Sequence, residues 1–368
     1  MMLRINLFII SCFLFFSVFC QDTLNINSKD YEDSFQDSIL RINQANIKLQ
    51  DAQKFYNEGV DFFNIKDYEN AINSFDMSIK NDSSFFDAYF FRYKSYYFLA
   101  EYMAGINDLT RMLDFGTKKD TLYYEFAKSF IMLNNLEFAK KNLEKSIKHN
   151  ENFYLSYYQL GVIFFLEKNY KKSIKKFNKC IELNKNYVYA YNDLGSSYKE
   201  LGDYEKALKY YKIAIEKDSS LYFTYSNLAS VYRITEDYEN ALINYEKSIQ
   251  ENPSYYIALN NIASLHFIMG DLEKSLLYCD KTISLKNDYD LAYLNKGACL
   301  YSLTKYKEAI KSFDQAIKYN PNNAQAYMNR GAAKEMVRDV DGACSDWNKA
   351  LSLGVSDAKK YILYDCKY

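Results

Sequence analysis

Residues 188–221 read VYAYNDLGSSYKELGDYEKALKYYKIAIEKDSSL, and the pattern of this stretch returns along most of the chain. Stretches of the same length, with no insertion or deletion between them, begin at Ala52, Phe86, Asp120, Tyr154, Val188, Tyr222, Tyr256, Asp290 and Ala324. We call them repeats one to nine and number the positions within each from 1 to 34. A period of thirty-four residues is typical of helix-turn-helix units that stack into a solenoid. The sequence therefore predicts an all-α array of helical hairpins.

Small side chains recur at two positions of the repeat. Position eight is Gly or Ala in every repeat except repeat two, which has Tyr93, and position twenty is always Ala, Gly or Ser. Positions four and twenty-four are mostly aromatic, as in Tyr191 and Tyr211 of repeat five. The small positions fall in different helices of the hairpin, so the two backbones can approach there while the bulky residues fill the space between them.

This pattern resembles the tetratricopeptide repeat family, whose repeats place an aromatic residue, Leu, Gly, Tyr, Ala, Phe, Ala and Pro at these places. Repeat five matches nearly throughout, with Tyr191, Leu194, Gly195, Tyr198, Ala207, Tyr211 and Ala214. The resemblance covers residues 52–355 and implies an alpha-alpha superhelix of nine repeats. Their ranges are 52–85, 86–119, 120–153, 154–187, 188–221, 222–255, 256–289, 290–323 and 324–355.

Polar residues at fixed positions predict helix caps and ion pairs. An Asp at position sixteen can cap the second helix of a hairpin, and it occurs as Asp67, Asp203, Asp237, Asp271 and Asp339. Arg92 and Asp108 occupy the same two positions in repeat two as Arg330 and Asp346 in repeat nine. We therefore expect each pair to join the two helices of its hairpin in a structural role.

Residues 1–20 have the composition of a signal peptide. Arg4 precedes an apolar run from Leu7 to Cys20, which is about the length of a signal-peptide core and short for a membrane-spanning helix. We expect an exported protein, periplasmic, at the cell surface or secreted, with cleavage after Cys20. Lipidation of Cys20 and an uncleaved anchor remain alternatives, although Phe19 is bulky where a lipobox has Gly or Ala.

The segments that flank the repeats are expected to cover the ends of the array. Residues 21–51 begin with a polar linker from Thr23 to Asp33, predicted to be disordered, and continue with apolar residues at helical spacing: Phe35, Ile39, Ile42, Ala45 and Leu49. This second half could fold back as a cap on repeat one. Residues 356–368 predict a C-terminal capping helix with Ala358, Tyr361, Ile362 and Cys366 on its inner face.

The cysteines do not suggest a disulfide framework. After signal removal, an odd number would remain, far apart in the sequence: Cys180, Cys279, Cys299, Cys344 and Cys366. Most are best interpreted as small hydrophobic residues of the packing. Cys299 and Cys344 are nearest in the expected stack, but we do not predict a bridge between them.

Composition and motifs argue against catalysis and nucleic-acid binding. The only histidines are His149 and His266, and His266 stands where the family usually has a packed Tyr. No phosphate-binding loop, paired-cysteine metal motif or nucleophile elbow occurs. We therefore predict no enzyme, no catalytic residue, no cofactor and no metal. The net charge of −1 lacks the positive surplus that phosphate contacts require, so we predict no nucleic-acid partner either.

The resemblance also implies a binding surface. In this family the first helices of the hairpins line the concave groove, with positions two, five, six, nine, twelve and thirteen facing inward. Position six is Asn in repeats one, six, seven, eight and nine, as Asn57, Asn227, Asn261, Asn295 and Asn329. The last four resemble the asparagine ladder in the repeat superhelix of O-linked N-acetylglucosamine transferase, which implies contacts to the backbone of an extended peptide. The alternative is that these amides bond locally within the stack.

Repeats one to four have aromatic residues at inward positions instead. The candidates are Tyr56, Phe90, Phe91, Tyr124 and Tyr158. Aromatic side chains often anchor a partner at an interface. The alternative is that neighbouring repeats, or residues 35–49, cover these rings.

Two hypotheses for the function follow. The first is a non-enzymatic exported scaffold, monomeric, that binds an extended peptide or a partner protein in its concave groove. The second is a structural component of a multiprotein cell-envelope assembly without a discrete peptide ligand.

Overall fold

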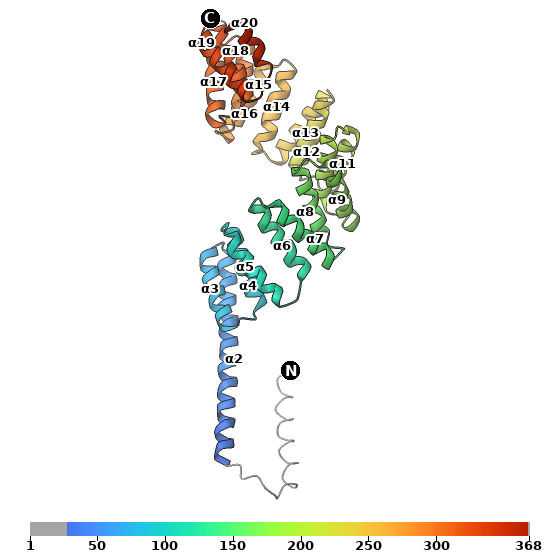
Figure 1. Cartoon of the computed structure of the whole chain (residues 1–368). Helices are drawn as coiled ribbons and strands as arrows, with labels where there is room; N and C mark the ends of the chain where they lie inside the picture. The colour runs from blue at the N-terminus through green and yellow to red at the C-terminus, as the bar shows by residue number, and fades with distance from the viewer. Residues whose placement is uncertain (1–27, 367–368) are drawn as a thin grey trace. The chain divides into compact units, whose positions relative to one another are not determined.

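The computed structural model describes residues 28–366, and every regular element in that range is an α-helix (Figure 1). The helices are α2 (Ser28–Asn64), α3 (Tyr68–Asn81), α4 (Phe86–Phe98), α5 (Tyr102–Asp114), α6 (Lys119–Met132), α7 (Leu136–His149), α8 (Tyr154–Leu166), α9 (Tyr170–Leu183), α10 (Val188–Glu200), α11 (Tyr204–Lys217), α12 (Tyr222–Ile234), α13 (Tyr238–Glu251), α14 (Tyr256–Ile268), α15 (Leu272–Leu285), α16 (Asp290–Ser302), α17 (Tyr306–Tyr319), α18 (Ala324–Met336), α19 (Val340–Ser352) and α20 (Ala358–Asp365). The predicted all-α class of stacked helical hairpins is confirmed. The predicted signal peptide and Cys20 lie outside the described residues.

The chain divides after Asn135 into two compact parts. Helices α2 to α6 belong to the first part, and helices α7 to α20 belong to the second. Within each part, a helix packs against the helices that precede and follow it in the sequence. None of the helices within residues 28–366 is both long and apolar enough to cross a membrane.

Glycine at position eight lets the two helices of a hairpin approach closely. A Cβ added to Gly195 on α10 would lie 2.9 Å from ring atoms of Tyr211 on α11, which is fully buried. The same contact joins Gly59 to Phe75, Gly161 to Phe177, Gly297 to Phe313, and Gly331 to Trp347. The small residue and the large ring therefore form one packing pair, as the sequence pattern predicts.

Repeat two reverses this pairing. Tyr93 occupies position eight on α4, is buried, and packs its ring against Gly105 at position twenty on α5. Its hydroxyl donates to the Glu125 carboxylate on α6, with 2.7 Å between the oxygens. The large side chain therefore comes from the first helix, and the space for it comes from the second.

The turn inside each hairpin has a constant geometry. The Asp side chains predicted as caps all accept a hydrogen bond from the backbone N–H three residues later, at Asp67, Asp203, Asp237, Asp271 and Asp339. The preceding residue, position fifteen, has a positive φ in every repeat: Lys66, Ala100, Asn134, Lys168, Gly202, Glu236, Gly270, Thr304 and Arg338. Only two of these are glycine, so most repeats place an L side chain in the left-handed region.

The N-terminal flank differs from the prediction. Residues 35–49 are helical, but they belong to the single helix α2, which begins at Ser28 inside the stretch predicted as disordered. They do not fold back on repeat one, and the N-terminal half of α2 extends beyond α3 (Figure 1). Its apolar side chains are exposed, Phe35 at 55% and Ile42 at 60%. The sequence between residues 49 and 52 contains neither Gly nor Pro, so no strong turn signal interrupts the helix.

The C-terminal flank packs as predicted but contains an unexpected bond. On α20, Ala358 is fully buried and Ile362 packs against the cluster around Trp347. Cys366, at the end of α20, forms a disulfide with Cys344 on α19, with 5.7 Å between the Cα atoms. The interpretation of these two cysteines as small hydrophobic residues is therefore wrong, because α20 turns back along α19 and brings them together. Cys180, Cys279 and Cys299 are free and buried.

Candidate binding groove

The position-six asparagines lie on the first helices of their hairpins. Asn57 is exposed on α2, and the row of four in the second part, on α12, α14, α16 and α18, is half-buried. We call the surface formed by positions two, five, six, nine, twelve and thirteen of the first helices the groove face. Every predicted groove residue lies on it by register. Some of these residues belong to the first part of the chain and the others to the second.

Two of the four asparagines form bonds between neighbouring repeats. The Asn227 amide donates to Oδ1 of Asn192 at 3.1 Å, and the Asn295 amide donates to Oδ1 of Asn260 at 2.9 Å. In both cases, position six of one repeat meets position five of the repeat before it, 35 residues away. The alternative of local bonding therefore holds for one N–H of each of these two amides.

The other two asparagines of the row have no such bond. The Asn329 carbonyl accepts from Gln325 on the same helix at 2.8 Å. Within residues 28–366, the Asn261 side chain makes no hydrogen bond. Its half-buried amide keeps its donors and its acceptor available on the groove face.

The same contact between positions five and six occurs with other side chains. The Tyr158 hydroxyl on α8 donates to Oδ2 of Asp193 on α10 at 2.8 Å. In the first part, the rings of Tyr56 and Phe91 meet edge to face with 5.9 Å between their centroids. This relationship was not among the predictions from the sequence, although polar or aromatic pairs recur there at a constant spacing of 35 residues.

The aromatic candidates of the first part are half-buried in contacts with one another. Tyr56 and Phe91 pack against the cluster around Phe75. The Phe90 ring lies 4.4 Å from the Lys94 ammonium, and the Tyr124 ring lies 5.8 Å from that of Lys128. Neighbouring rings or lysine side chains therefore lie against each of these residues, and residues 35–49 do not.

A large cavity lies at the C-terminal end of the groove face. Its volume is about 640 Å³. It lies between repeats eight and nine, where it is lined by Ala298, Tyr301, Phe313, Asn329 and Ala332 at positions nine, twelve, twenty-four, six and nine. Asp357, Lys360 and Tyr361, on and next to α20, also line it. The capping helix thus contributes to the groove, which the sequence analysis did not foresee.

A second, smaller cavity occupies the same register positions between repeats four and five. Its volume is about 210 Å³, and it is lined by Val162, Phe165, Phe177, Asp193 and Ser196. Positions nine, twelve and twenty-four come from one repeat, and positions six and nine come from the next. Pockets therefore occur at equivalent places in the stack, and position six contributes a polar group to each.

Family models match this chain in four stretches. The model described as "Tetratricopeptide repeat" matches residues 154–187, 188–221 and 224–255, and the model described as "TPR repeat" matches residues 299–336. The first two stretches coincide with repeats four and five of the register. The chain contains tetratricopeptide repeats. The count of nine stays a prediction.

Solved structures of tetratricopeptide repeat proteins share the fold. A tetratricopeptide repeat protein from Parabacteroides merdae is 18% identical, with a TM-score of 0.56 over 68% of this chain and 100% of that one. Pseudomonas aeruginosa pilF is 19% identical, with a TM-score of 0.51 over 58% of this chain and 98% of that one. The Cut9–Hcn1 hetero-tetramer of the APC/C contains a chain that is 12% identical, with a TM-score of 0.58 over 86% and 76%. No curated protein sequence matches this chain. At these identities the likenesses show the fold alone.

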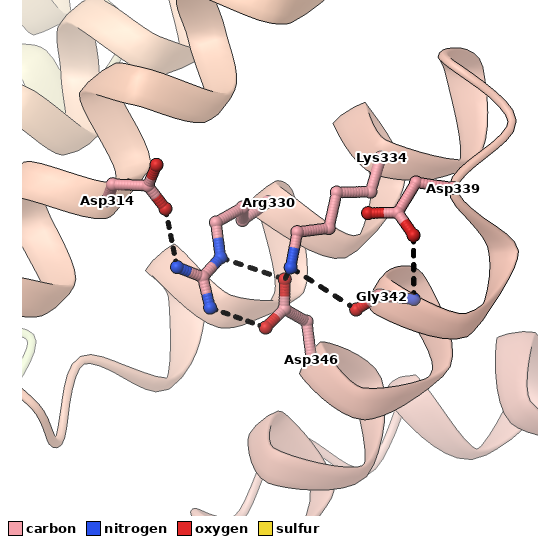
Figure 2. Close-up of polar contacts among 6 residues, drawn as sticks. All are labelled: Asp314, Arg330, Lys334, Asp339, Gly342 and Asp346. Atoms are coloured by element: carbon pink, nitrogen blue, oxygen red, sulfur yellow. Dashed lines mark hydrogen bonds and ion pairs between the residues drawn. The ribbon is translucent and has the colours of Figure 1, made fainter.

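The predicted ion pairs inside the tetratricopeptide hairpins are confirmed. Arg330 on α18 donates to both oxygens of Asp346 on α19 and to Asp314 on α17, and Lys334 lies 2.9 Å from Asp346 (Figure 2). Arg92 contacts Asp108 and Asp76 in the same register. Burial raises the pKa of Asp108, although Arg92 acts in the opposite direction. These groups join helices, and their mutual contacts account for their polar atoms.

His266 is buried, and its ring stacks on Tyr278 with 5.6 Å between the centroids. This agrees with its interpretation as a packed residue. Among the described residues, no three His, Cys, Asp or Glu side chains gather closely enough to hold a metal ion. The tetratricopeptide repeats and their structural neighbours support a scaffold for protein–protein interaction.

Proposed function

We propose that this chain is a non-enzymatic, exported and monomeric scaffold that binds an extended peptide, or an extended segment of a partner protein, along its groove face. The observation that carries the proposal is the pair of cavities at equivalent register positions, one beside Asp193 and one beside Asn329. An extended chain projects side chains at regular intervals and could place them in such pockets. Position six lies beside each pocket, where an amide can bond a peptide backbone.

The half-buried amide of Asn261 supports the same conclusion. It is unfavourable to remove a polar group partly from water without giving it a hydrogen-bond partner in the protein. A peptide backbone could supply the missing hydrogen bonds. Asn261 lies between two asparagines that do bond to neighbouring repeats. Its amide is thus available to a ligand where the equivalent amides of Asn227 and Asn295 are partly engaged.

Export is supported by the disulfide between Cys344 and Cys366 together with the apolar run that precedes residue 21. Disulfides persist in oxidising compartments and are rare in reducing ones. Mass spectrometry of the protein from its native source, after alkylation without reductant, tests this. A chain that begins after Cys20 and carries the bridge is expected, whereas a full-length chain with alkylated Cys344 would contradict export.

The binding test uses Asn261→Ala and Asn329→Ala, because neither change removes a bond between repeats. Partners captured by the immobilised mature chain are identified first, and their affinity for each variant is then measured. We expect each substitution to weaken binding about tenfold, with an unchanged melting temperature. Asn244→Ala and Asn348→Ala are the controls, since these amides lie on the second helices α13 and α19 and bond only within their own helix. If all four variants bind the partners with equal affinity, the proposal that the partners bind along the groove face is refuted.

The exposed apolar surface of α2 favours a second candidate function, a structural component of a cell-envelope assembly. Ile42, Ile47 and Leu49 are each more than half exposed on the part of α2 that precedes the repeats. Ile42→Lys with Ile47→Lys tests it. Loss of co-purifying proteins in this double variant, combined with normal binding by Asn261→Ala, would favour assembly through α2 over peptide binding.

A further inference from the structure

Asp193 stands at position six immediately before the row of four asparagines. Repeats six to nine have Asn there, whereas repeat five places a half-buried carboxylate at the same point on α10. The side chains of Asp and Asn have nearly the same shape. The difference between Asp193 and the asparagines is therefore one of charge.

The Asp193 carboxylate accepts hydrogen bonds only from neutral groups. Tyr158 donates to Oδ2, and the Asn192 amide donates to Oδ1, each at 2.8 Å. Between residues 28 and 366, no Lys, Arg or His forms an ion pair with it. A carboxylate has about four lone-pair positions, so about two remain free. Burial raises the pKa of Asp193, while the two hydrogen bonds lower it.

The surrounding walls suit a long side chain with a charged end. Val162, Phe165 and Phe177 supply apolar surface, and the cavity of about 210 Å³ opens next to the carboxylate. The methylene groups of Lys and Arg pack well on apolar surface while their charged ends seek a polar partner. Aromatic rings in the same wall add a favourable contact for a cation.

The equivalent place between the next two repeats differs in charge. In repeats five and six, Asn227 replaces Asp193 at position six, and Lys199 replaces Phe165 at position twelve. That place combines a neutral amide with a protein cation and should be less favourable for a second cation. The preference for positive charge would therefore be specific to one place on the groove face.

We propose that the pocket formed by Val162, Phe165, Phe177, Asp193 and Ser196 binds the ammonium or guanidinium group of a Lys or Arg side chain in the bound peptide. This inference rests on the proposed peptide-binding function and names one residue class that the groove selects. The ligand side chain would supply the cation that Asp193 lacks, in a charge-assisted hydrogen bond.

The test is selection from a random library of peptides about ten residues long, because an extended peptide can span several repeats. The wild-type chain should enrich Lys or Arg at one position about tenfold over the library, and Asp193→Asn should lose this enrichment. Asn261→Ala is the matched control. It should weaken all peptides without changing the preference for a cation.

A second measurement uses only the wild-type protein. Norleucine in place of the selected Lys keeps the aliphatic carbons of the side chain and removes the ammonium group, and should weaken binding about tenfold. Unchanged affinity of the norleucine peptide, or unchanged enrichment by a folded Asp193→Asn variant, would overturn the inference. Peptides bound without any preference for Lys or Arg would also overturn it, while the proposed function would stand. Binding of no peptide at all would refute the proposed function and this inference with it.

Discussion

Arg330 on α18 and Asp346 on α19 form a two-pronged ion pair, with 2.8 Å between Nε and Oδ2 and a second bond from the terminal guanidinium nitrogen. Sixteen residues separate them, and sixteen separate Arg330 from Asp314 of the preceding hairpin. The guanidinium therefore joins two helices of one repeat and a helix of the repeat before it. Arg92 occupies the equivalent place between Asp76 and Asp108.

Removing the arginine should cost more stability in repeat two than in repeat nine. Asp346 keeps Lys334 as a second cation at 2.9 Å, whereas Asp108 has no other ion-pair partner among residues 28–366. We expect Arg92→Ala to lower the free energy of unfolding by about 3–5 kcal/mol, because it leaves a buried carboxylate unpaired, and Arg330→Ala to lower it less. Urea unfolding measures both. Arg111→Ala, at an exposed pair, should have little effect, and equal losses for Arg92 and Arg330 would contradict this account.

The disulfide should stabilise α20 and, with it, the cavity that residues of α20 line. The bond spans 22 residues, for which the loss of chain entropy in the unfolded state suggests about 3 kcal/mol. Cys366→Ser should therefore lower the melting temperature. It should also weaken the binding of any ligand that occupies the cavity and contacts Lys360 or Tyr361. Reductant should reproduce this effect in the wild-type chain and add nothing to the variant. Identical melting with and without reductant would show that the bond does not stabilise the fold.

Position fifteen offers a stabilising substitution. Thr304 is a β-branched residue with a φ of 60°, where Gly202 and Gly270 occupy the equivalent turns. The left-handed conformation costs such a residue about 1 kcal/mol or more, and glycine pays no such steric cost. We expect Thr304→Gly to raise the melting temperature and Gly270→Thr to lower it. If the melting temperature changes in the opposite direction in each variant, contacts other than the backbone conformation determine the stability of the turn.

His266 should make the stability depend on pH in the acid range. Burial lowers its pKa, with Lys274 acting in the same direction and Asp271 and Glu246 opposing it. The pKa of an unfolded histidine is about 6.5. A histidine whose folded-state pKa is lowered contributes stability that is present above its unfolded pKa and is lost as the pH falls through its folded-state pKa. Each unit of lowering corresponds to about 1.4 kcal/mol.

His266→Phe removes the titrating group and keeps a ring against Tyr278. We expect the loss of stability between neutral pH and about pH 5, the range that contains the unfolded histidine pKa, to be smaller in this variant. Urea unfolding at a series of pH values measures the difference. Parallel curves for the variant and the wild type would exclude His266 as the cause.

The sequence predicted which residues share the groove face, but not which of their side chains form hydrogen bonds with one another. The constant register places Asn227, Asn261, Asn295 and Asn329 at the same point of successive first helices, so their common face followed from the period. Which amides are engaged depends on the rotation between neighbouring repeats, and that rotation brings Asn192 to Asn227 and Asn260 to Asn295. The pocket at Asp193 was missed for the same reason, since it is built from two repeats.

The hairpin fold, the helix caps and the pairing of small residues with aromatic rings followed from the sequence alone, because they depend on contacts repeated at short and constant spacing. The course of the two flanking segments depended on tertiary structure. A helical pattern shows that residues 35–49 form a helix, but it does not show whether that helix reverses or continues from Ser28 into repeat one. The pattern likewise predicts α20, but only its packing on α19 brings Cys366 to Cys344 and adds Lys360 and Tyr361 to the cavity at that end of the groove face. The direction of a flanking segment is set by its tertiary contacts, which a local pattern does not contain.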